Sequence, residues 1–185
     1  MVRVIMGVKG TGKTKQMIEL INSAVHSENG NVVCIERGPK LTYDIHYKIR
    51  LVEASHYDIK SYDFLKGFIS GLYAGNYDIT HVFIDSLTKI VASEATDHAV
   101  EEFLDWLNSF SEKNNIKFTV TISADASLAT DGVKKYFGYV PFQRALPPAG
   151  PAASFLPPSG VKSLVHPAYR RRTLDNIPIA WDYRP

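Results

Sequence analysis

Short apolar runs alternate along this chain with longer segments in which apolar residues recur at every third or fourth position. The runs cover residues 2–6, 32–36, 81–85 and 117–123. Because they are short and continuous and contain many β-branched residues, they predict strands buried within a sheet. The segments with helical spacing predict helices after residue 14, after residue 61 and around residues 100–110.

Strands that alternate with helices predict crossover connections between the strands. Such connections produce a mostly parallel sheet with helices on both faces, so we expect an α/β fold in the form of a three-layer sandwich. In sheets of this kind, ligands bind beyond the carboxyl ends of the strands. Candidate functional residues are therefore expected directly after each predicted strand.

Three local features refine this outline. Residues 44–52 alternate between apolar and polar, which predicts a half-exposed strand and fits an edge position. Residues 127–136 predict a short helix. In the helix that Ser61 is expected to cap, Gly67 and Gly71 predict close packing on the sheet.

The composition changes near Gly138. Residues 1–138 carry 15 Lys and Arg and 17 Asp and Glu, whereas residues 139–185 carry 6 and 2. Nine of the ten prolines also fall in the second part. This change predicts a folded domain over residues 1–138 and a Pro-rich basic extension over residues 139–185 that is irregular or disordered.

The single cysteine and the length of the apolar runs limit the class of protein. Cys34 lies in an apolar run and has no partner for an internal disulfide. No apolar run approaches the roughly 18 residues of a membrane span. We therefore expect a reduced, cytoplasmic protein without a membrane partner. The sequence does not indicate nucleic-acid binding, and a homo-oligomer or a protein partner stays open.

A glycine-rich loop, "GVKGTGKT", directly follows the first predicted strand. It fits the pattern G-x-x-x-x-G-K-[ST], and it opens a predicted helix, which is the context that this phosphate-binding pattern requires. Its glycines allow successive backbone N–H groups to point at phosphate oxygens, and the helix dipole adds to the positive field. The residues expected to contact the nucleotide are Gly7, Val8, Lys9, Gly10, Thr11, Gly12, Lys13, Thr14 and Lys15.

Two residues are expected to hold Mg²⁺ beside the phosphates. Thr14 supplies the hydroxyl group of the loop pattern. Asp85 ends the apolar strand of "HVFIDSL" and suits a Walker B carboxylate; capping of a following helix is the competing interpretation. Because no guanine-reading N-K-x-D motif is present, ATP is the expected nucleotide.

A catalytic base is not supplied by the residue after Asp85, which is Ser86. Glu36 ends the second predicted strand and is the candidate for orienting a water molecule at the γ-phosphate, with Lys13 as the second catalytic residue. Ser123 and Asp125 end another strand, where they fit either a γ-phosphate contact or a helix cap. Arg37 is interpreted as a surface residue, with a role as a charge-stabilising finger in an oligomer as the alternative.

Together, "GVKGTGKT", "VVCIERG" and "HVFIDSL" resemble the RecA/KaiC-like branch of P-loop ATPases. In that branch a glutamate closes the strand after the phosphate-loop helix, and the Walker B aspartate is often followed by Ser-Leu or Ser-Val. The resemblance implies a RecA-like sheet, Glu36 as the catalytic glutamate, and Thr14 and Asp85 as the residues that position the metal ion.

Residues 1 to about 137 are similar to a family of small clostridial ATP-binding proteins. The similarity lies in segments 10–14, 30–36, 74–87 and 123–136, and members often carry the label of a twitching-motility ATPase. The resemblance implies ATP binding. The family's members end near position 136, so residues 139–185 depart from its pattern.

Three functions remain open at this point. The first is a slow ATPase, and the second is a nucleotide-binding switch or interaction module with little turnover, because Ser86 replaces a glutamate. A small-molecule phosphotransferase is less favoured, since residues 1–138 hold only Arg3, Arg37 and Arg50 and so cannot supply a multi-arginine lid.

Overall fold

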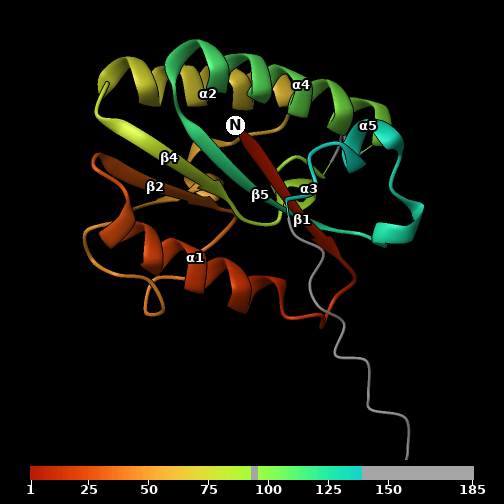
Figure 1. Cartoon of the computed structure of the whole chain (residues 1–185), viewed down its shortest axis with the longest axis horizontal. Coiled ribbons are helices and arrows are strands. Elements are labelled where there is room, and N and C mark those ends of the chain that lie inside the picture. Colours follow the sequence, from red (N-terminus) through yellow and green to blue (C-terminus); the bar gives the residue numbers. More distant parts are fainter. Residues whose placement is uncertain (93–95, 139–185) are drawn as a thin grey trace, which may run out of the picture. The chain divides into compact units, whose positions relative to one another are not determined.

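Five parallel strands form one sheet in the computed structural model, which describes residues 1–92 and 96–138 (Figure 1). Their order across the sheet is β1-β5-β4-β2-β3, so β5 separates β1 from β4. The strands are β1 (Val2–Gly7), β2 (Asn31–Glu36), β3 (Arg50–Glu53), β4 (Ile79–Ile84) and β5 (Lys117–Ser123). The predicted extension over residues 139–185 lies outside the described residues.

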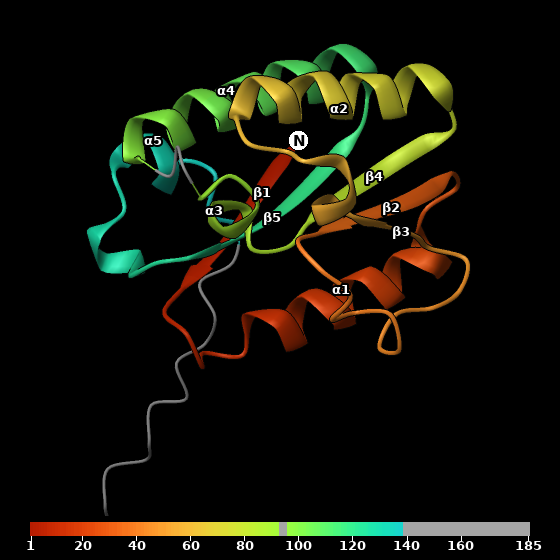
Figure 2. The ribbon, with the colours of Figure 1, turned by 180° about the vertical axis from the view of Figure 1, so that it is seen from behind.

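The helices cover both faces of the sheet. Helix α1 lies on one face, and α2 and α4 lie on the other, which gives the expected three layers (Figures 1 and 2). The α-helices are α1 (Lys13–Ser27), α2 (Tyr62–Gly75), α3 (Leu87–Ile90), α4 (Asp97–Asn114) and α5 (Asp131–Lys134). No helix within residues 1–92 and 96–138 has the length and apolar character that crossing a membrane requires.

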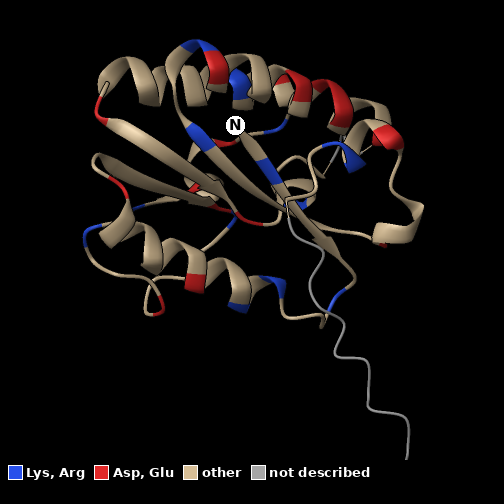
Figure 3. Ribbon diagram, viewed as in Figure 1, with Lys and Arg blue, Asp and Glu red and all other residues tan. Residues whose placement is uncertain are grey.

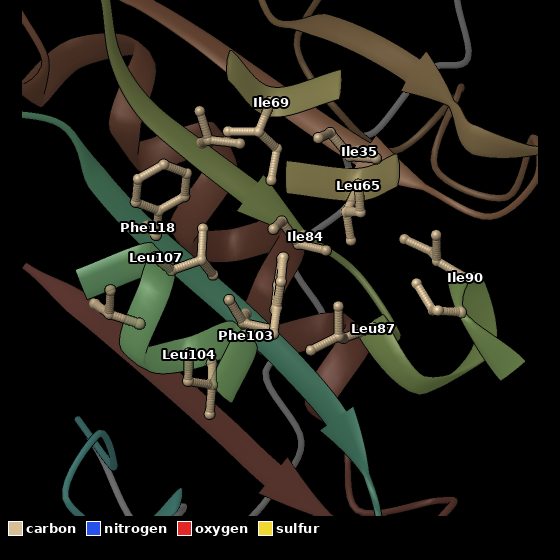
Figure 4. Close-up of a cluster of buried hydrophobic side chains, with 14 of the residues drawn as sticks. Ile35, Leu65, Ile69, Ile84, Leu87, Ile90, Phe103, Leu104, Leu107 and Phe118 are labelled. Carbon is tan, nitrogen blue, oxygen red and sulfur yellow. The ribbon is translucent and has the colours of Figure 1, made fainter. Parts of the chain in front are cut away.

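A separate hydrophobic core fills each face of the sheet. On the α2 and α4 side, Ile84 packs among residues such as Leu65, Phe103 and Phe118 (Figure 4). On the α1 side, Phe83 packs with residues of α1 such as Met17. Because side chains alternate along a strand, neighbours in sequence enter opposite cores, which explains why the strands are continuous apolar runs.

Two of the predicted local features are confirmed. Ser61 caps α2, since its Oγ accepts a 3.1 Å hydrogen bond from the backbone N–H of Phe64. β3 occupies the edge of the sheet, as its alternation indicated. Cys34 is fully buried in β2, and this burial raises the pKa of its thiol.

The prediction of a strand over residues 44–52 is wrong for its first half. Residues 41–48 form turns, and β3 begins only at Arg50. The side chain of Asn22, on α1, accepts a 2.8 Å hydrogen bond from His46 N and donates a 2.9 Å bond to Asp44 O. These bonds satisfy backbone groups that a strand would otherwise pair, while Ile45 packs on the α1 core and creates the misleading alternation.

Two further predictions need correction. Residues 127–136 do not form one helix, because a 3₁₀ turn (Ala126–Leu128) and the single turn of α5 (Asp131–Lys134) replace it. Gly67 and Gly71 are exposed on α2, and no heavy atom lies within 4 Å of the position that a Cβ would take on either. Close packing on the sheet is therefore not the reason for these glycines.

Candidate functional site

The glycine-rich loop joins the carboxyl end of β1 to the first turn of α1. Gly10 (φ +92°) and Gly12 (φ +82°) adopt left-handed backbone conformations, which side chains other than glycine rarely tolerate. At Gly7, a Cβ atom would lie 2.8 Å from Oγ1 of Thr11, so a larger residue would require the Thr11 side chain to shift. The backbone conformation of the loop thus favours glycine at positions 10 and 12.

Among the described residues, no side chain caps the amino terminus of α1. Gly12 is the N-cap residue and provides no side-chain hydrogen bond, and the first turn contains no acidic residue. Instead, Lys13 and Lys15 occupy that turn, where positive charges are unfavourable beside the dipole. An anion such as a phosphate group would complement both the backbone N–H groups and these lysines.

Lys13 lies inside the loop. Its side chain is only 8% exposed, and its Nζ donates a 2.7 Å hydrogen bond to Val8 O and a 3.4 Å bond to Thr11 Oγ1. Burial lowers the pKa of Lys13, the positive charge of Lys89 lowers it further, and Asp85 acts in the opposite direction. The ammonium group is therefore held within the loop by Val8 and Thr11.

Asp85 follows β4 and is buried, with both carboxylate oxygens bonded. Oδ1 accepts a 2.8 Å hydrogen bond from the hydroxyl of Thr121 on β5, and Oδ2 accepts a 3.1 Å bond from Ser86 Oγ. Thr121 in turn accepts a 2.6 Å bond from Ser86 N. Ser86 has a left-handed backbone conformation (φ +55°), which is uncommon for a residue other than glycine and concentrates at functional sites.

Glu36 ends β2 and is only 1% exposed. Its carboxylate accepts hydrogen bonds of 3.1 to 3.2 Å from the backbone N–H groups of Lys40 and Leu41. Burial raises the pKa of Glu36, and the charges of Asp85 and Glu53 act in the same direction, while the two backbone bonds partly offset them. A carboxylate with a raised pKa is a better proton acceptor near neutral pH.

The sheet brings these residues to one edge and one face. Gly7, Glu36 and Asp85 all lie at the carboxyl ends of their strands. Alternation places Glu36 on the same side as Cys34, and Asp85 on the same side as Phe83, both of which belong to the α1 core. The phosphate-loop pattern and both predicted carboxylates therefore face a common region.

Two cavities lie at this edge and share two lining residues. One, of about 310 Å³, is lined by the loop, including Lys13, together with Thr14 and Ser123. The other, of about 400 Å³, is lined by Glu36 and Asp85. Ser86 and Lys89 line both cavities, so they form the boundary between the glycine-rich loop and the two carboxylates.

Of the remaining predicted residues, some line these two cavities and others do not. Thr14 and Lys9 are exposed and line the loop cavity, and Arg37 lines the cavity that contains Glu36. Lys15 is exposed. Asp125 caps the 3₁₀ turn after β5, where it accepts bonds of 2.9 and 2.8 Å from Ser127 N and Oγ, which matches the helix-cap interpretation.

Sequence reasoning missed Thr121 and Lys89. Thr121 belongs to the apolar run of β5, and only the pairing of β5 beside β4 brings its hydroxyl to Asp85. The polar positions of "KFTVTIS", which alternate with Phe118, Val120 and Ile122, were the available signal. Lys89 belongs to α3, a single helical turn that is too short to give a periodic pattern in the sequence. Figure 3 shows basic residues in the turn between β1 and α1 as well.

The donors at this edge fit Mg²⁺ bound together with a nucleotide. Mg²⁺ is usually held by one or two carboxylates or hydroxyl groups plus phosphate oxygens and water, and not by an all-protein set of ligands. Thr14 lines the loop cavity and Asp85 lines the adjoining cavity, so these two residues are the candidates for that small set. The described residues contain no group of three or more His, Cys, Asp and Glu side chains that could hold a metal ion.

Comparison with known proteins does not extend this description. No protein-family model matches the chain, and no curated protein matches it. The candidate site is therefore described from the residues of this chain alone.

Proposed function

We propose that this protein binds Mg-ATP at the loop Gly7–Thr14 and hydrolyses the γ-phosphate slowly. The single observation that carries the proposal is the phosphate-binding pattern at the carboxyl end of β1, with its left-handed glycines and the uncapped start of α1. Backbone N–H groups and Lys13 would contact the β- and γ-phosphates. Thr14 and Asp85 would hold Mg²⁺, which neutralises phosphate charge during transfer.

The strand order supports this assignment of roles. β5 separates β1 from β4, and β2 lies on the far side of β4, so the loop, Asp85 and Glu36 follow one another across the edge. In this arrangement the terminal phosphate of a nucleotide bound at the loop would extend towards the carboxylates. Glu36 would then orient the attacking water molecule and accept its proton.

A second candidate function is supported by the hydrogen bonds that Glu36 accepts. The carboxylate of Glu36 is engaged with the N–H groups of Lys40 and Leu41, and so it is tied to the segment that follows β2. A nucleotide that draws Glu36 away would release this segment. The protein would then act as a nucleotide-dependent switch or interaction module with little turnover.

Calorimetry and a hydrolysis assay on three forms of the protein test the two candidates. Lys13→Ala should abolish Mg-ATP binding, because it removes the ammonium group at the centre of the loop. Glu36→Gln should retain binding but lower hydrolysis by about 100-fold or more. If the wild-type protein binds Mg-ATP without turnover, the switch is the correct function. If Lys13→Ala binds as tightly as wild type, both candidates are wrong.

A further inference from the structure

Lys89 occupies a central position among the cavities of the carboxyl edge. It lines the cavity of the phosphate loop and the cavity of Glu36 and Asp85. It also lines a third cavity, of about 280 Å³, together with Arg37. Its side chain is therefore within reach of both the glycine-rich loop and the two carboxylates.

The backbone beneath Lys89 is firmly held. Helix α3 is anchored by the fully buried side chains of Leu87 and Val91, and Ile90 is 8% exposed. The N-cap residue of the helix is Ser86, whose N–H donates a hydrogen bond to the Thr121 hydroxyl, and Lys89 N donates a 2.8 Å hydrogen bond back to Ser86 O. The lysine stem therefore projects from a fixed point, while the side chain itself is exposed and free to move its ammonium group.

Within residues 1–92 and 96–138, Lys89 has no salt-bridge partner. Lys13 and Lys89 both line the cavity of the loop, and the positive charge of Lys89 contributes to the lowered pKa of Lys13, after burial. An anion between them would relieve this repulsion and bind both groups.

We propose that Lys89 binds the terminal phosphate of a nucleoside triphosphate held in the loop, and that it makes the site prefer the triphosphate over the diphosphate. This inference rests on the proposed nucleotide binding and adds a specificity role for a residue outside the sequence pattern. Lys89 borders the side of the loop that faces Glu36 and Asp85. The phosphate nearest to that side is the terminal one, which a diphosphate lacks.

Calorimetry on the full chain tests the inference without reference to turnover. ADP and a non-hydrolysable ATP analogue are titrated, each with Mg²⁺, into wild type, Lys89→Met, Lys89→Arg and Lys113→Met. Lys113 is exposed in the last turn of α4 and lines none of the three cavities, so its variant controls for loss of one surface charge. Methionine retains the length of the stem and removes the charge.

The inference expects a selective effect. Lys89→Met should bind the ATP analogue about 10-fold more weakly, in line with the loss of a charged hydrogen bond, and bind ADP within about 2-fold of wild type. Lys89→Arg should recover most of the affinity, and Lys113→Met should match wild type. Equal weakening for both nucleotides, or no weakening for either, would overturn the inference while leaving the nucleotide site in place. If wild type binds neither nucleotide, the proposed function fails first, and the inference fails with it.

Discussion

The hydroxyl group of Thr121 on β5 donates a 2.8 Å hydrogen bond to Oδ1 of Asp85, which directly follows the neighbouring strand β4 and lies 36 positions away along the chain. The same oxygen of Thr121 accepts a bond from Ser86 N. One buried side chain thus satisfies a carboxylate oxygen and a backbone N–H at once. It fixes the carboxylate that is proposed to hold Mg²⁺.

Replacing Thr121 with valine should destabilise the protein, because it retains the shape of the side chain but removes both hydrogen bonds. The free energy of unfolding is expected to fall by about 1–3 kcal/mol, the usual effect of leaving a buried polar group unsatisfied. Thr121→Ser keeps the hydroxyl and should lose less. Urea denaturation of the three proteins measures the difference, and equal midpoints and slopes for Thr121→Val and wild type would contradict the role assigned to this hydroxyl.

Ionisation of Glu36 should oppose folding. Its pKa in the folded protein is raised above the ordinary value of 4.5, chiefly by burial, so the folded state holds the proton more tightly than the unfolded state. The stabilisation from the protonated form is complete below pH 4.5 and is lost as the pH rises through the raised pKa. Glu36→Gln should therefore gain stability relative to wild type on going from pH 4 to pH 7. A constant difference in unfolding free energy over this range would refute the prediction.

His81 should make the protein sensitive to mild acid. Its burial lowers its pKa from 6.5 to about 4, although Glu28 acts in the opposite direction, so the imidazole is neutral at pH 7 and its 3.3 Å contact with Glu28 is a hydrogen bond. Stability is complete above pH 6.5 and is lost as the pH falls towards 4, by up to about 3 kcal/mol.

His81→Phe provides the comparison for this prediction. Phenylalanine keeps a ring where His81 stacks on Phe83, at a centroid distance of 4.0 Å, but it cannot titrate. Denaturation midpoints measured from pH 7 to pH 4 should fall less steeply for this variant. Parallel curves for the two proteins would mean that His81 is not the source of the acid sensitivity.

Alanine should stabilise α2 at two positions. Gly67 and Gly71 are exposed within the helix and have open space where a Cβ would lie, so Gly67→Ala and Gly71→Ala are each expected to add about 0.5–1 kcal/mol. Gly12→Ala is the matched contrast: open space is present there too, but a φ of +82° should make alanine cost about 1–2 kcal/mol. Thermal unfolding separates the two cases, and a loss of stability at position 67 or 71 would show an unrecognised role for those glycines.

The sequence predicted most of the strands and helices because each forms a local pattern. It also located Gly7, Glu36 and Asp85, since each directly follows or ends an apolar run. It did not predict that β5 lies between β1 and β4, because strand order depends on packing over the whole sheet. That order is what joins Thr121 to Asp85.

A local pattern gave a wrong prediction at residues 44–52, where a distant side chain forms hydrogen bonds with the backbone. Asn22 of α1 holds the turns at residues 41–48, and the sequence of this segment gives no sign of that contact. The sequence pattern did not indicate Lys89 as a candidate site residue either. Its importance comes from the cavities it borders, whereas its sequence neighbours form only one turn of helix.

The side of β5 that faces α1 carries three residues with hydroxyl groups, and their positions depend on the register of the strand. Thr119 contacts His81, Thr121 contacts Asp85, and Ser123 lies opposite Gly7 in the strand register. A slip of β5 by one residue would turn all three hydroxyl groups towards the opposite core. Among the described strands, β5 is the last along the chain, so these hydroxyl groups come from the part of the sheet that is synthesised after the other four strands.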